Sequence, residues 1–268
     1  MQSKKPVGNI TRGTTNPNRL RRIDRYIAAH PQLRLDTDPI VVDLGFGANP
    51  TTAIEMLERL QQVQPNVTVV GIEIDRERVA KALPCQTDNL LFGLGGFETP
   101  LPKPLNTDAP VTAIRAMNVL RQYDESEVRA AWNLMQSRLT KTGFVVEGTC
   151  DEIGRIASWV TLGESGPKFF TISLKLRGLN KPSKVAERLP KALIHHNVEG
   201  EPIHSLLRDL DTAWATHAPL GIFSPAQRFV ACAKELRAKG WAISLEPKRW
   251  RMGEITLAWE AVAPLNLG

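Results

Sequence analysis

The chain has 268 residues, of which 42% are hydrophobic and 23% charged, a composition typical of a globular protein with a full-sized core. No uncharged apolar run approaches the roughly 18–20 residues of a membrane-spanning helix, and the N-terminus lacks the apolar stretch of a secretory signal. We therefore expect a cytoplasmic protein with no membrane partner. Its three cysteines, an odd number without a C-x-x-C pair, predict reduced thiols.

The positive charge is concentrated at the start of the chain. The formal net charge is +6, and residues 1–25 carry seven Lys or Arg against a single Asp, which equals the whole excess. Two further basic clusters span Lys168 to Lys191 and Lys234 to Arg251. Such an arm and patches can attract phosphate groups. A solvated surface is the alternative, because no aromatic residue is interleaved to stack on bases.

Apolar β-branched segments alternate with helical patterns from residue 39 to residue 150. A Gly-, Thr-, Asn- and Pro-rich arm leads into a helix over 21–29, and Gly residues or acidic residues end the strands that follow. Five strands that alternate with helices predict a parallel sheet covered on both faces. The expected strands are PIVVDL, VTVVGIEID, NLLF, VTAIRAMNV and GFVVEGTC.

The alternation changes at Asp151, because only four residues separate the fifth strand from the next apolar segment. No crossover helix fits there, so RIASWVTL and KFFTISLKL read as a hairpin. Ser224, Pro225 and Gln227 predict a capped helix over 225–239. We expect a basic arm and helix (1–30), a core (31–150), an inserted α+β subdomain that recognises substrate (151–223), and a C-terminal helix with two strands that complete a seven-stranded sheet (224–268). Alternatively, the hairpin ends the sheet and the C-terminus is an appendage.

The segment VVDLGFGANP and the acidic end of the next strand predict a ligand site. Gly45 and Gly47 lie where a strand turns into a helix, so a ligand can approach bare backbone and free N–H groups. Glu73 ends the neighbouring strand, where a carboxylate can accept hydrogen bonds from both ribose hydroxyls. A dinucleotide fingerprint requires a third glycine where this chain has Pro50. The pattern indicates a nucleoside cleft, with nicotinamide or flavin binding as the less favoured alternative.

With Asp43 at the start of its D-x-G-x-G spacing, the chain resembles the class I S-adenosylmethionine-dependent methyltransferases over about residues 39–150 and 225–263. The resemblance implies a Rossmann-like, mostly parallel α/β sheet and S-adenosyl-L-methionine as cofactor. It places Asp43, Gly45 and Gly47 around the methionine part of the cofactor and Glu73 on the ribose. It also places Ile74, Gly96 and Phe97 against the adenine.

The resemblance also implies a methyl-transfer site after the fourth strand. Asn118 and Tyr123 are the catalytic candidates there, and Arg121 is a candidate for substrate binding, although all three could instead cap and support the following helix. His195 and His196 are substrate-binding candidates in the inserted segment. Cys150 stands where RNA pyrimidine C5-methyltransferases carry a nucleophile, but their D-x-P-C partner motif is missing, so we expect a buried thiol. No spacing predicts a metal site.

The expected function is transfer of a methyl group to an unidentified acceptor. The basic arm favours RNA or another phosphate-bearing molecule slightly over a small metabolite. A different class of function also fits these residues: a non-catalytic protein that binds the nucleoside in its cleft and holds nucleic acid through the arm. The sequence does not indicate an oligomeric state.

Overall fold

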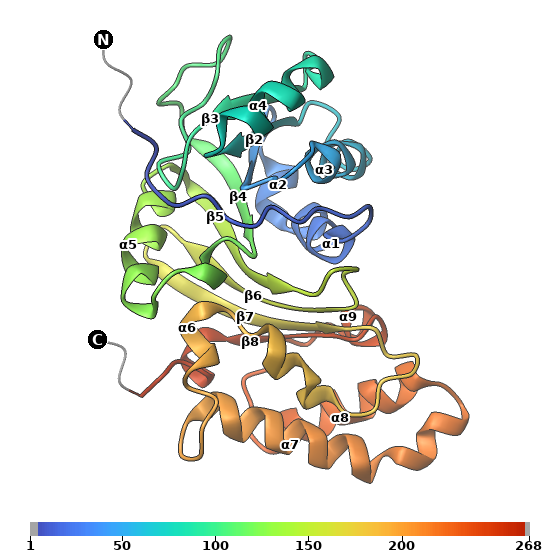
Figure 1. Ribbon diagram of the computed structural model, residues 1–268. Coiled ribbons are helices and arrows are strands. Elements are labelled where there is room, and N and C mark those ends of the chain that lie inside the picture. Colours follow the sequence, from blue (N-terminus) through green and yellow to red (C-terminus); the bar gives the residue numbers. More distant parts are fainter. Residues whose placement is uncertain (1–4, 266–268) are drawn as a thin grey trace. The chain divides into compact units, whose positions relative to one another are not determined.

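The computed structural model describes residues 5–265, in two units (Figure 1). The first unit comprises the residues up to Glu147 together with 152–154 and 162–166, and the second comprises 148–151, 155–161 and the residues from Pro167 onward. Eight strands follow the order β3-β2-β1-β4-β5-β6-β7-β8. None of the helices within residues 5–265 combines the length and apolarity needed to cross a lipid bilayer.

The first unit begins with an irregular arm and then alternates strands with helices. Its elements are α1 (Arg21–Ala29), α2 (Pro31–Leu35), β1 (Ile40–Leu44), α3 (Thr51–Gln61), β2 (Thr68–Glu73), α4 (Arg76–Ala82), β3 (Leu90–Leu94), β4 (Val111–Met117), α5 (Glu125–Gln136) and most of β5 (Leu139–Cys150). Figure 1 shows α1, α2 and α3 on one side of this part of the sheet and α5 on the other.

The strands β3, β2, β1 and β4 are paired in parallel. Strand β1 is central, with Val42 opposite Val70 of β2 and Ile114 of β4, and all three side chains are fully buried. Because this sheet is covered on both faces, its strands are almost continuously apolar. The order β3-β2-β1-β4-β5 is that of a doubly wound sheet, and it confirms the predicted Rossmann-like α/β class.

A buried ion-pair network joins four elements of the first unit. Arg115 of β4 has no exposed side-chain surface and contacts Asp43 of β1 (2.7 Å) and Asp24 of α1. It also donates to the carbonyl of Thr52 at the start of α3 (3.0 Å). Arg59 of α3 binds the other oxygen of Asp24 (2.6 Å). Buried charges are tolerated where partners surround them in this way, so the network fixes α1 against the sheet.

The second unit contains strands from the β6–β7 hairpin and a helical layer. Its elements are β6 (Ile156–Gly163), β7 (Gly166–Leu174), α6 (Lys191–Ile194), α7 (Pro202–Thr216), α8 (Pro225–Ala238), α9 (Pro247–Arg251) and β8 (Glu254–Ala258). The residues next to the β6–β7 turn, 162–166, belong to the first unit. Strand β8 pairs antiparallel with β7, and α7 packs on α8. Helix α8 begins as predicted, with the Ser224 hydroxyl accepting from the N–H of Gln227 (3.1 Å).

The sheet differs from the prediction in its second half. It has eight strands instead of seven, because the hairpin contributes β6 and β7 to the strand order between β5 and β8. The segment 151–223 is therefore not wholly an insertion outside the sheet. The expected strand WAISL is absent: Ile243 makes only an isolated bridge to Leu257, since Trp241 is still bonded to the carbonyl of Leu236 at the end of α8.

Candidate functional site

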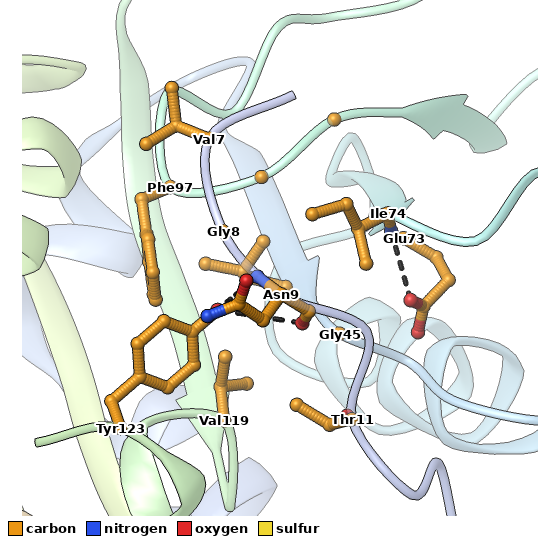
Figure 2. A pocket seen from close by; sticks show the side chains of 13 residues that line it. Val7, Gly8, Asn9, Thr11, Gly45, Glu73, Ile74, Phe97, Val119 and Tyr123 are labelled. Carbon is orange, nitrogen blue, oxygen red and sulfur yellow. Dashed lines mark hydrogen bonds between the residues drawn. The ribbon is translucent and has the colours of Figure 1, made fainter. Parts of the chain in front are cut away.

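Four loops meet at the carboxyl edge of the parallel strands. Gly45 follows β1 with a φ of +72°, Glu73 ends β2, Phe97 lies in the loop after β3, and Tyr123 follows β4. Because these strands run parallel, their carboxyl ends lie on one edge, where ligands bind in open α/β sheets. The four residues line a single cavity in the first unit (Figure 2).

The carboxylate of Glu73 is buried and surrounded by donors. Its Oε2 accepts from the N–H of Gly47 (3.0 Å), and its Oε1 accepts from the N–H groups of Ile74 (2.9 Å) and Asp75 (3.3 Å). The guanidinium of Arg78 lies 3.7 Å from Oε2. A carboxylate offers about four acceptor positions. Glu73 therefore has about one position left, which a ribose hydroxyl could fill; binding by two hydroxyls would need one of these donors to move.

Apolar and aromatic side chains form the remaining wall. Ile74 lies on one side of the cavity, and Phe97 and Tyr123 lie on the other, with their rings edge-to-face at 5.3 Å (Figure 2). Gly96 belongs to the same lining. Burial raises the pKa of the Tyr123 hydroxyl above its usual value. This hydroxyl therefore stays protonated at neutral pH.

The N-terminal arm passes through this cavity. Residues 7–9 run between Phe97 and Tyr123 on one side and Ile74 on the other (Figure 2). The N–H of Phe97 donates to the carbonyl of Val7 (3.0 Å), and the N–H of Asn9 donates to the Tyr123 hydroxyl (2.5 Å). The cavity beside the arm measures about 20 Å³. A water needs about 10–15 Å³, whereas cofactor pockets span about 300–1,000 Å³, so with the arm in place the cavity has room for a water and not for a cofactor.

Six of the predicted cofactor and catalytic residues line the cavity: Gly45, Glu73, Ile74, Gly96, Phe97 and Tyr123. Gly47 lies next to it and contributes its N–H to Glu73. Asp43 is outside the lining, because its carboxylate is occupied by Arg115 and by the Thr52 hydroxyl (2.9 Å).

The predicted acceptor-binding residues belong to both units, Asn118 and Arg121 to the first and His195 and His196 to the second. Asn118 directly follows β4 in the left-handed region (φ +62°), a strained conformation that is enriched at functional sites, but it does not line the cavity. Arg121 is exposed. His195 and His196 belong to the second unit, where the Nδ1 of His196 lies 3.7 Å from Glu201.

The sequence-based prediction assigned no role in the site to arm residues 7–15, to Arg78 or to Glu98. Glu98 accepts from the N–H of Gly96 (3.0 Å) through one oxygen and from the N–H of Val7 (3.0 Å) through the other. Arg78 donates to the carbonyl of Thr11 (2.8 Å). These contacts involve the backbone of the arm, which no side-chain pattern reveals. For Arg78, the sequence offered one signal of a role in the site, its position five residues after Glu73.

Cysteines and metal-ligating side chains do not add to the site. Cys150 is fully buried, and Cys85, Cys150 and Cys232 form no disulfide with one another. Among the described residues 5–265, no group of three or more His, Cys, Asp and Glu side chains is placed to hold a metal ion.

Comparison with known proteins gives a limited result. No family model matches the chain, and no curated protein matches it. Solved structures with a similar fold include human N-acetylserotonin methyltransferase in complex with SAM (18% identity, 49% of this chain, 35% of that chain, TM-score 0.35). Another is magnesium protoporphyrin IX methyltransferase from Synechocystis with bound SAH (14% identity, 47% of this chain, 54% of that chain, TM-score 0.35). The matched part spans about half or less of these chains.

Proposed function

We propose that the protein is an S-adenosylmethionine-dependent methyltransferase whose cofactor binds at the carboxyl edge of β1, β2, β3 and β4. One observation carries this proposal: Gly45, the buried carboxylate of Glu73, and the apolar pair Ile74 and Phe97 face one cavity. Gly45 lets a ligand approach the backbone closely, and Glu73 is an acceptor for ribose hydroxyls. Ile74 and Phe97 are two apolar walls for a base.

Apart from the arm, the residues that line the cavity fit the cofactor chemically. Both glycines have a positive φ, +72° at Gly45 and +88° at Gly47, and a Cβ added to Gly45 would lie 2.9 Å from Val119. Bare backbone is therefore required at both turns. The N–H of Phe97 points at the arm carbonyl of Val7, so the same donor suits an acceptor nitrogen of adenine. The cavity beside the arm is too small for the whole cofactor.

The chain's own residues have modest chemical work in this reaction. A sulfonium cofactor supplies an already activated methyl group, so the protein must align the acceptor and exclude water. Gly45 and Gly47 allow close approach, Glu73 orients the ribose, and Ile74 and Phe97 hold the base. The protonated Tyr123 hydroxyl can donate a hydrogen bond to an acceptor, because burial raises its pKa. Asn118, at the end of β4, is the second candidate beside the acceptor.

For the acceptor, we propose RNA or another phosphate-bearing molecule. The side chains of Lys5 and Arg12 in the arm are exposed. Their charge is therefore available to phosphates. The protein incubated with methyl-labelled cofactor and separate RNA, protein and metabolite fractions should label RNA. Label in the metabolite fraction alone would contradict this choice of acceptor.

The cofactor assignment is tested at Glu73. Glu73→Ala removes the acceptor for the ribose hydroxyls and should weaken binding of S-adenosylmethionine by about 1–3 kcal/mol, measured by calorimetry. The matched control is Glu77→Ala, an exposed glutamate on α4, which should bind as the unchanged protein does. Equal affinity in the Glu73 variant would contradict the proposed site.

A further inference from the structure

We propose that residues 7–15 form a strap that occupies the adenosyl part of the cofactor site, so that docking of the strap and binding of the cofactor exclude each other. This inference rests on the proposed function. It assigns the arm a role beyond attraction of phosphates: the strap controls access to the cofactor site.

The strap takes hydrogen bonds that a nucleoside would need. The carbonyl of Val7 accepts from Phe97 in the loop after β3 (3.0 Å), and the carbonyl of Gly13 accepts from Ala48 in the loop after β1 (2.8 Å). Both loops line or adjoin the ends of the parallel strands. A ligand that reaches these N–H groups must therefore replace the carbonyls of the strap, which already satisfy them.

The strap also takes the space that an adenine ring would need. Gly8 lies between the two apolar walls: a Cβ at this position would be 3.5 Å from Ile74 and 3.6 Å from Phe97. At Gly96, an added Cβ would lie only 1.9 Å from the Val7 carbonyl oxygen. The strap is thus in direct contact with the surfaces proposed to hold the base, and a base cannot share them with it.

The strap can leave without unfolding the first unit. It has no regular secondary structure, and its apolar side chains are largely in solvent: Val7 is 44% exposed and Ile10 is 62% exposed. By contrast, Ile23 and Ile27 of the following helix are fully buried. Segments with few buried apolar contacts open at low free-energy cost. Release therefore ends at α1, which stays anchored by Asp24 and Arg115.

This exclusion lowers the apparent affinity for the cofactor. A ligand that binds only the open state has its apparent Kd raised by the inverse of the open fraction. Weakening the docked strap without altering the walls of the site should therefore tighten binding. Gly8→Val does this, because Gly8 has a φ of +139° and an added Cβ would lie 2.9 Å from the Tyr123 hydroxyl. The matched control is Gly200→Val, at a φ of +95° with open space around it.

The first measurement is calorimetry with S-adenosylhomocysteine as the probe. Gly8→Val should bind at least about five-fold more tightly than the unchanged protein, by the population argument, and Gly200→Val should not. Equal or weaker binding by Gly8→Val would overturn the strap while leaving the cofactor assignment in place. If the probe binds neither protein, nor a variant that begins after residue 15, the proposed function fails and the strap with it.

The second measurement does not depend on activity. Trypsin cleavage after Arg12, followed by mass spectrometry, reports release of the strap, because a docked backbone resists cleavage. Saturating S-adenosylhomocysteine should accelerate this cleavage in the unchanged protein. Slower cleavage would show that the arm closes over a bound cofactor, and an unchanged rate would show that the two do not compete. Either result overturns the proposal.

Discussion

Glu147 on β5 is buried, and an oxygen of its carboxyl group accepts a hydrogen bond from the indole N–H of Trp132 (3.3 Å). Burial raises the pKa of this carboxyl to about 8. Between the ordinary pKa near 4.5 and pH 8, the folded state therefore holds a proton that the unfolded state has released. Stability conferred by this residue is greatest below pH 4.5 and falls as the pH rises toward 8.

Glu147→Gln should remove this loss, because the amide keeps an acceptor for Trp132 and does not ionise. At pH 8–9 the variant should be more stable than the unchanged protein by on the order of a few kcal/mol, with little difference near pH 4.5. Urea unfolding at both pH values measures the two differences. A stability difference that does not change with pH would contradict a proton on Glu147 in the folded state.

At the residue scale, local sequence signals predicted residues that line the cavity better than they predicted which side chains pair with one another. Gly45 and Glu73 could be predicted because turns at strand ends require particular residue types. Asp43 shares that pattern, yet its carboxylate pairs with Arg115, a residue 72 positions away whose charge gave no sign of burial. Long-range partners of this kind depend on the packing of the whole fold, which local spacing does not contain.

At the scale of elements, the Arg115 network links α1, β1, α3 and β4. Arg115→Met would leave the buried carboxylates of Asp24 and Asp43 without this cation, so it should lower the free energy of unfolding by about 3–5 kcal/mol. The control is Arg76→Met, an exposed arginine at the start of α4, with an expected change within about 0.5 kcal/mol. Denaturant unfolding compares the two. A small loss in Arg115→Met would mean that the network contributes little net stability.

The success of the element predictions depended on how local their signals are. Helix α1 matches its expected range, and α8 begins at Pro225 with Ser224 as its N-cap, as predicted, because caps and apolar spacing act within a few residues. The β6–β7 hairpin was predicted as a hairpin, but its place in the strand order was not. Alternating residues show that a strand is half-buried, and they do not show which neighbour it pairs with.

The arm is the clearest case in which sequence could not specify position. Its Gly, Asn, Thr and Pro residues predicted irregular backbone, which is what the structure has. Its contacts with Phe97 and Ala48 use main-chain carbonyls, which every residue possesses. Nothing in the composition therefore distinguishes an arm that reaches into solvent from one that enters the cavity.

At the scale of the whole molecule, the net charge of +6 equals the excess carried by residues 1–25. The one acidic residue of that segment, Asp24, is buried against Arg115 and Arg59, so it does not neutralise the exposed cations of the arm. Polyanion binding through those cations releases counterions and weakens as salt rises. The excess charge thus predicts salt-dependent binding of RNA through the arm.

Lys5→Glu with Arg12→Glu tests this directly, because both side chains are exposed. If each contacts a phosphate of single-stranded RNA, the slope of log K against log salt should fall in magnitude by about 1.4 or more. Lys81→Glu with Lys141→Glu, two exposed lysines outside the arm, carries the same change in net charge and should keep the slope nearer to that of the unchanged protein. Filter binding over a salt series measures all three. Equal slopes in the two double variants would mean that net charge attracts RNA and that the arm makes no local contact with it.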